Sequence, residues 1–140
     1  MGFPLGALDS RFSYAPREVG ALFWSLGDSG RARYLLVTKL DLIFIGVYFF
    51  FFVSLAQFWA KSWVGLSLTC AFAALMALCD LGETLGTRYL LEIFPAADNP
   101  MELFVSRCTP LKWYAFAGVA LSLFGLWWRR WERTKAAGAG

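Results

Sequence analysis

Five charged side chains lie at the ends of long apolar stretches, where an isolated charge is costly. They are Asp41, Asp80, Glu83, Arg88 and Lys112. On a helix that turns about 100° per residue, Asp80, Glu83 and Arg88 project from one side. Clustered carboxylates in a membrane bundle often hold a cation, a proton or a polar ligand. Alternatively, the acids pair with Arg88 and Lys112 and fix how the helices dock, which the nearby partner charges favour.

The composition argues against most catalytic and metal chemistry. Histidine is absent, which removes the commonest general base and the usual nitrogen ligand of haem and zinc. No nucleophile motif and no glycine-rich phosphate loop is present. The net charge of +3 comes with basic residues beside the apolar stretches, so anionic headgroups are a better counter-charge than nucleic acid. We therefore predict no catalytic residue, cofactor, metal or nucleic-acid partner.

The three cysteines have no metal-ligand spacing. Cys70 and Cys79 lie about 180° apart on one helix and cannot pair with each other. A bridge between Cys79 and Cys108 is the alternative to buried free thiols, and we expect the free thiols.

The elements that must position these groups are typical membrane helices. Hydrophobic residues make up 59% of the chain and the mean hydropathy is +0.54, which is too apolar for an ordinary soluble domain. Residues 42–60 carry no charge and are long enough to cross a bilayer. Residues 63–81 return across it, and residues 113–128 form a third, shorter span. We expect an all-α membrane domain over residues 34–131, with a helical loop between spans two and three.

The flanking segments have simpler patterns. Residues 1–15 have no signal-peptide pattern and are expected to be mobile. Residues 16–33 predict an amphipathic, interfacial helix and a turn, since Pro16 suits the first helical position and Gly27 ends an apolar stripe. Residues 132–140 are expected to form a disordered tail.

Two further sets of residues follow from the membrane interpretation. Small residues that permit close helix packing are Gly82, Gly86, Gly118, Ser122 and Gly125. Anchors at the membrane–water interface are Trp59, Lys61, Trp63, Trp113, Trp128, Arg129, Arg130 and Trp131. Basic residues flank both ends of the bundle, so the orientation in the membrane stays open.

Several short patterns resemble a diffuse group of small, largely uncharacterised bacterial multi-pass membrane proteins. The patterns are Tyr14-x-Pro16-x-Glu18, Leu26-Gly27-x-x-Gly30-Arg31-x-x-Tyr34, Asp41 with Tyr48, Asp80-x-x-Glu83, and Pro100 with Thr109-x-x-Lys112. The chain departs from the group at Ala15, where a hydroxyl residue is usual, and at Thr84, where asparagine is usual. The resemblance implies a membrane bundle of three or four helices in the bacterial inner membrane and implies no reaction.

Two functions from different classes remain. The shortage of catalytic groups and the small-residue faces favour a non-catalytic structural or accessory subunit of a membrane assembly, in contact with other membrane subunits or itself. The alternative is a small carrier or ligand-binding membrane protein that uses the carboxylate cluster. An enzyme is not expected.

Overall fold

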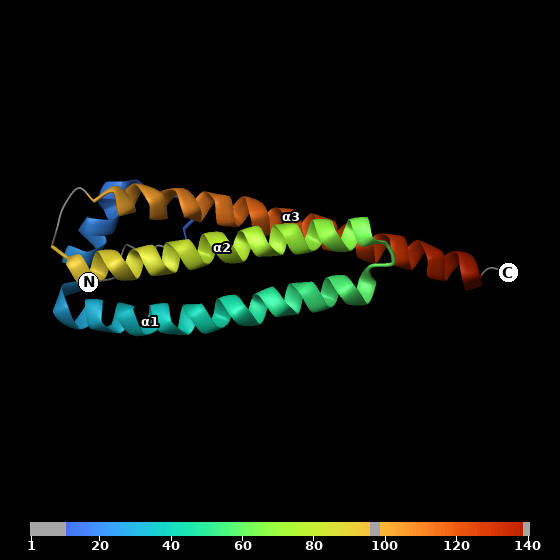
Figure 1. The fold of residues 1–140 in the computed structure, drawn as a ribbon, viewed down its shortest axis with the longest axis horizontal. Helices are drawn as coiled ribbons and strands as arrows, with labels where there is room; N and C mark the ends of the chain where they lie inside the picture. The colour runs from blue at the N-terminus through green and yellow to red at the C-terminus, as the bar shows by residue number, and fades with distance from the viewer. Residues whose placement is uncertain (1–10, 96–98, 139–140) are drawn as a thin grey trace.

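The computed structural model describes residues 11–95 and 99–138, and all regular structure in these residues is helical. Helix α1 runs from Pro16 to Trp59, α2 from Trp63 to Ile93, and α3 from Pro100 to Gly138. The three helices lie side by side and are much longer than they are thick (Figure 1). Helix α2 packs against both α1 and α3, so it forms the centre of the bundle.

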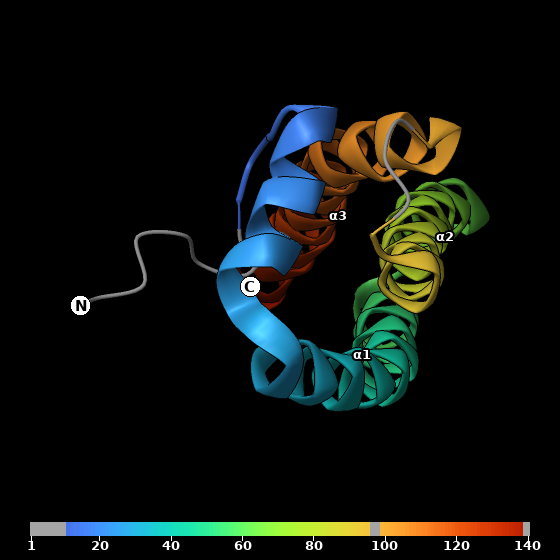
Figure 2. The ribbon, with the colours of Figure 1, turned by 90° about the vertical axis from the view of Figure 1, so that its left-hand side faces the viewer.

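A break at Gly27 divides α1 into two parts. Gly27 has φ of +62°, a backbone conformation that side-chain-bearing residues rarely adopt, and the helical direction changes there. The short part before Gly27 lies across the beginning of α3, while the long part runs beside α2 (Figure 2). Pro16 starts the helix, and the Ala15 amide donates to Glu18 Oε1 at 3.0 Å, which satisfies one of the free donors at the helix start.

A tight link at residues 60–62 joins α1 to α2. The Ser62 side chain caps α2 by accepting a hydrogen bond from the Gly65 amide at 3.5 Å. α3 then runs along this hairpin and extends beyond it at its C-terminal end (Figure 1).

Two apolar clusters hold the bundle together. At the end that contains Gly27, the short part of α1 and the residue Tyr14 before it pack against α2 and α3. The buried side chains of this cluster are Tyr14, Val19, Leu22, Phe23, Leu90, Leu91 and Val105. Toward the hairpin, the core is thinner and consists of Ala56, Ala73, Val119, Leu123 and Leu126. Small residues let the helices approach closely there.

α1 and α2 each contain an apolar stretch that is long enough to cross a membrane. Only 17% of each stretch is buried, so most of its large apolar side chains point outward. The core helix of a soluble protein would instead bury most of that surface. Among the described residues, α3 contains no stretch that is both as long and as apolar as these two.

Several segments differ from the sequence prediction. The predicted helical loop is not separate, because residues 100–109 form the first turns of α3 and the helix continues through Pro110. Val105 and Thr109 before Pro110, and Lys112 after it, are buried on one side, so tertiary packing holds the helix despite the missing N–H. Residues 132–138, expected to be disordered, continue α3. Residues 96–98 and 139–140 lie outside the described residues.

The predicted mobile segment also takes a definite place where the structure describes it. Tyr14 is 7% exposed and belongs to the first apolar cluster, and the Arg11 carbonyl accepts a hydrogen bond from Trp113 Nε1 at 2.9 Å. Residues 11–15 therefore lie against the bundle, held by aromatic contacts, hydrogen bonds and an ion pair between Arg11 and Glu18 that a pattern search does not predict. Residues 1–10 lie outside the described part.

Candidate functional site

A buried ion-pair network joins α2 to α3 between the two apolar clusters. Asp80 and Glu83 are three residues apart on α2, so both face α3. Lys112 of α3 reaches between them, and its Nζ lies 2.9 Å from Asp80 Oδ1 and 2.8 Å from Glu83 Oε2. Lys112 is 6% exposed and Glu83 is 2% exposed. We call Asp80, Glu83 and Lys112 the ion-pair cluster.

Three hydroxyl groups supply the remaining hydrogen bonds of the carboxylates. Thr109 Oγ1 lies 2.6 Å and the Tyr14 hydroxyl 3.3 Å from Glu83 Oε1. The Tyr48 hydroxyl donates to Asp80 Oδ2 at 2.9 Å. All four carboxylate oxygens thus have a donor, and the network links α2 and α3 to α1 and to the segment before α1.

The hydroxyl partners are well suited to a negative, poorly solvated site. Burial, with a further contribution from the nearby Glu83 carboxylate, raises the pKa of Tyr14 far above its ordinary value. The Tyr14 hydroxyl therefore stays protonated and remains a donor. Two carboxylates and one ammonium leave a formal charge of −1, which the three hydroxyl groups stabilise by hydrogen bonding.

A cavity of about 350 Å³ lies beside the ion-pair cluster and is lined by residues of all three helices. Its polar lining comes from Asp41, Tyr48, Asp80 and Lys112. The rest of its wall is apolar or aromatic and consists of Phe44, Phe52, Met76, Trp113 and Phe116. The cavity is large enough for a small amphipathic molecule.

The structure brings together four of the five charged residues that the sequence singled out. Asp80, Glu83 and Lys112 are in direct contact, and Asp41 lines the adjoining cavity. Arg88 does not join them and instead pairs with Glu92, with 3.1 Å between Arg88 Nε and Glu92 Oε1. Eight residues on an α-helix leave Arg88 rotated by about 80° from Asp80, which is enough to turn its side chain toward the surface.

Sequence reasoning did not assign Tyr14 or Thr109 to the site. Thr109 comes three residues before Lys112, so a helix at this position brings both to one face. The sequence prediction placed residues 96–109 in the loop between spans two and three and so did not assign Thr109 to the site, although the Thr109-x-x-Lys112 spacing was noted. Tyr14 lies 69 residues from Glu83 in the sequence. Its only signal there was the pattern Tyr14-x-Pro16-x-Glu18, one of those that carry the resemblance.

Three of the five predicted packing positions lie at close contacts between α2 and α3. A Cβ added at Gly82 would lie 3.1 Å from the Phe104 ring, and one at Gly118 would lie 2.6 Å from the Phe72 ring. A Cβ at Gly86 would overlap Val105. Ser122 donates to the Val119 carbonyl within α3. A Cβ at Gly125 would meet nothing within 4 Å, so Gly125 is not needed for packing inside the chain.

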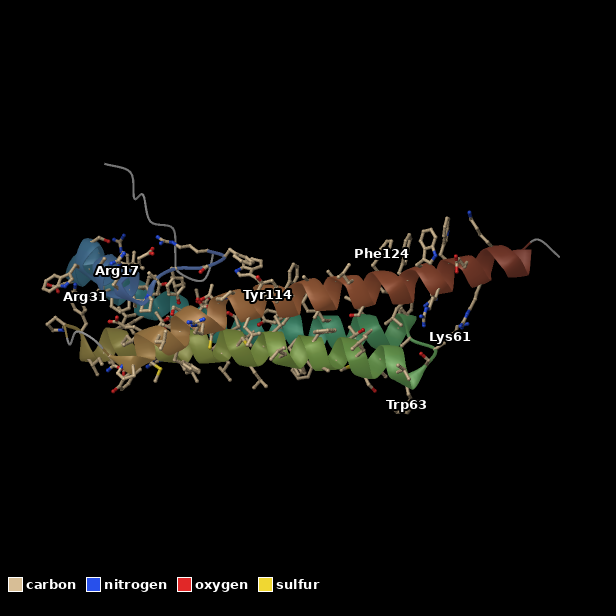
Figure 3. All side chains as sticks on the ribbon, turned by 90° about the horizontal axis from the view of Figure 1, so that it is seen from above. Arg17, Arg31, Lys61, Trp63, Tyr114 and Phe124 are labelled. Atoms are coloured by element: carbon tan, nitrogen blue, oxygen red, sulfur yellow. The ribbon has the colours of Figure 1, made fainter. Side chains whose placement is uncertain are left out.

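The predicted interface anchors fall into two groups. Trp113 lies beside the cavity, and its indole is tied to the Arg11 carbonyl. The other seven lie at the hairpin end of the bundle or on the part of α3 next to it, and they are Trp59, Lys61, Trp63, Trp128, Arg129, Arg130 and Trp131. Lys61 and Trp63 mark the hairpin in Figure 3, and Trp63 is 83% exposed.

The remaining predictions concern thiols, metals and relatives. All three cysteines are free, with Cys79 and Cys108 buried and Cys70 half-buried, which confirms the preferred alternative. Within residues 11–95 and 99–138, no cluster of acidic or cysteine side chains has the arrangement of a metal site. No protein-family model, curated protein or solved structure matches the chain.

Proposed function

We propose that the chain is a multi-pass protein of the bacterial inner membrane that serves as a non-catalytic structural or accessory subunit. In this proposal it crosses the membrane three times and packs within a larger assembly or with further copies of itself. The carrying observation is that the charged groups of the ion-pair cluster bond to one another and to hydroxyl groups of the same chain. Such a network fixes the position of the helices and leaves no activated group for a reaction.

The outward-facing apolar surface supports a membrane location. Exposed side chains on the hairpin helices include Ile43, Phe44, Val47, Phe50, Phe51, Leu68 and Leu78. In water this surface would promote aggregation, whereas in a bilayer lipid tails cover it.

The third span is proposed for residues 113–128 of α3. At 1.5 Å per residue this stretch is about 24 Å long, shorter than an average bilayer core of about 30 Å. Lys112 and Arg129 flank it, and Trp127, Trp128 and Trp131 beside Arg129 suit an interface. Local thinning and snorkelling of the flanking side chains accommodate such a difference.

The short part of α1 is proposed to lie at the membrane surface on the side of the Gly27 break. Val19, Leu22 and Phe23 are buried against the bundle, while Trp24 is 69% exposed. A helix with one face on the protein and an exposed tryptophan suits the headgroup region.

Two outward-facing glycines support contact with a partner helix. A Cβ added at Gly46 of α1 or at Gly125 of α3 would meet nothing within 4 Å in this chain. Small residues on a lipid-facing surface let a neighbouring helix approach closely. We infer that a helix of another subunit, or of a second copy, packs near these positions.

The experiment is isolation of the tagged protein from its native membrane in a mild detergent, followed by mass measurement of the intact complex. A partner in fixed stoichiometry, or a defined homo-oligomer, is the expected result. A lone monomer that stays folded would contradict the proposal.

A second candidate is a small carrier or ligand-binding protein, which the 350 Å³ cavity beside Asp80 and Lys112 favours. Substitution distinguishes the two. Under the structural proposal, Asp80→Asn and Glu83→Gln lower the stability of the bundle or its assembly. Under the ligand proposal, the fold persists and only the response to the ligand is lost.

A further inference from the structure

A cluster of positive charge lies at the hairpin end of the bundle, far along the helices from the ion-pair cluster. Lys61 of the link and Arg129, Arg130 and Arg133 of α3 line one hollow. The same hollow is lined by Trp59 and Ser62. We call these four basic residues the basic pocket.

The basic pocket has no neutralising group in the described part of the chain. None of its four basic side chains forms an ion pair with a described carboxylate. The acid nearest in sequence is Glu132, whose Oε1 accepts from Trp128 Nε1 at 2.8 Å. Four like charges in one hollow repel one another, and an anion between them relieves that repulsion.

The pocket forms because α3 extends beyond the end of the hairpin that α1 and α2 make (Figure 1). Val119, Leu123 and Leu126 are buried at alternating spacings of four and three residues. The same spacing continues to Arg130, which contacts Phe58 near the end of α1, and to Arg133 one turn further along α3. The arginines therefore follow the packing face of α3 and turn toward Lys61 rather than away from the bundle.

One arginine is held in place by the hairpin itself. Arg130 Nη1 donates to the Phe58 carbonyl at 2.7 Å, and its guanidinium lies 4.5 Å from the centre of the Phe58 ring. The carbonyl and the ring fix the side chain, while other N–H groups of the guanidinium remain available. The start of α2, directly after Ser62, adds the partial positive charge of a helix N-terminus.

We propose that the basic pocket binds the phosphate of an anionic phospholipid headgroup, an inference that rests on the proposed membrane location. Trp59, which lines the pocket, and the exposed Trp63, which directly follows Ser62 of the pocket, place it at the depth of the headgroups. The exposed Phe58 ring, 67% accessible, lies below Arg130 and offers a surface for the acyl chains. Arginine forms bidentate hydrogen bonds with phosphate. The four positive charges of the pocket exceed the single negative charge of one phosphodiester, so a lipid with two phosphates fits best.

The test titrates purified protein in mild detergent with phosphatidylcholine, phosphatidylglycerol or cardiolipin and counts bound lipids by intact mass. The native chain should retain one anionic lipid and no phosphatidylcholine, with cardiolipin bound more tightly than phosphatidylglycerol. At about 1 kcal/mol per basic residue, Arg130→Gln with Arg133→Gln should weaken binding by roughly 30-fold. Lys61→Gln, which leaves α3 unchanged, should weaken it by about 5-fold.

The matched control is Arg17→Gln with Arg107→Gln, which removes the same charge from exposed positions elsewhere on the bundle. Equal loss of binding in this control would mean that net charge alone attracts the lipid and would overturn the proposal. Displacement by millimolar inorganic phosphate would overturn it too, because the pocket would then bind a free anion. Extraction of the protein from membranes by alkaline carbonate would refute the membrane location itself. If the protein stays in the membrane at alkaline pH but binds all three lipids equally, only the lipid-binding role of the basic pocket would be refuted.

Discussion

Replacement of Lys112 by methionine tests whether the ion-pair cluster holds the bundle together. Methionine matches the unbranched apolar stem of lysine as far as the ε position but lacks the ammonium, which lies 2.9 Å from Asp80 and 2.8 Å from Glu83. Removing one partner of a buried ion pair typically costs about 3–5 kcal/mol, because the remaining charge is left uncompensated. Two carboxylates are stranded here, so we expect a loss of at least about 3 kcal/mol in the free energy of unfolding.

The matched control is Arg88→Met, which removes the cation of an exposed pair with Glu92 four residues away on the same helix. Such pairs are worth about 0.3–0.5 kcal/mol. Unfolding of both variants is measured in mixed micelles by titration with a denaturing detergent and followed by circular dichroism. Equal destabilisation by the two substitutions would refute the structural role of Lys112.

A triple variant sharpens this test. Asp80→Asn and Glu83→Gln added to Lys112→Met remove all three charges while retaining similar shapes. Buried ion pairs replaced by neutral groups of similar volume are often close to neutral in stability. We therefore expect the triple variant to recover most of the stability lost by Lys112→Met. No recovery would mean that the loss came from packing.

Three further predictions follow from the contacts. Gly118→Leu should destabilise the bundle by about 1–3 kcal/mol, because a Cβ at this position would lie 2.6 Å from the Phe72 ring. Gly125→Leu should leave the unfolding midpoint nearly unchanged, because a Cβ there would meet nothing within 4 Å. Tyr14→Phe removes one hydroxyl from Glu83 and should cost about 0.5–1.5 kcal/mol in the same titration, without loss of helix content. Alkylation of unreduced, denatured protein should add three alkyl groups by intact mass, one for each cysteine, whereas a single added group would indicate that the other two thiols form a disulfide.

The sequence predicted the helical class and the main charged contact for identifiable reasons. A run without charge over residues 42–60 and the i, i+3 spacing of Asp80 and Glu83 are local patterns that depend on one helix at a time. Lys112 was expected nearby because it ends its apolar stretch on the same side. The three meet as expected.

The parts that the sequence did not predict depend on contacts between distant segments. Tyr14 reaches Glu83 only because the break at Gly27 folds the start of α1 across α3, and a glycine alone does not specify that direction. Residues 96–109 were predicted as a helical loop separate from the third span, although buried residues before and after Pro110 keep α3 helical through it. Arg88 was predicted to join Asp80 because a side chain rotated by about 80° from Asp80 around α2 was counted as lying on the same face of the helix.

The basic pocket shows the same limitation. Arg129 and Arg130 read as membrane anchors in the sequence, and nothing local indicated that Lys61, about 70 residues away, would face them. The hollow exists because the packing face of α3 continues beyond the hairpin.

The measurement that tests the account most directly compares the native chain with the Glu83→Gln variant, each expressed as the sole copy and isolated in mild detergent from the native membrane. The account predicts a stoichiometric complex for the native chain and a marked loss of that complex for the variant, because Glu83 helps to hold the shape that the partner contacts. A native chain recovered only as a folded monomer, or a variant complex recovered at the native level, would contradict the account.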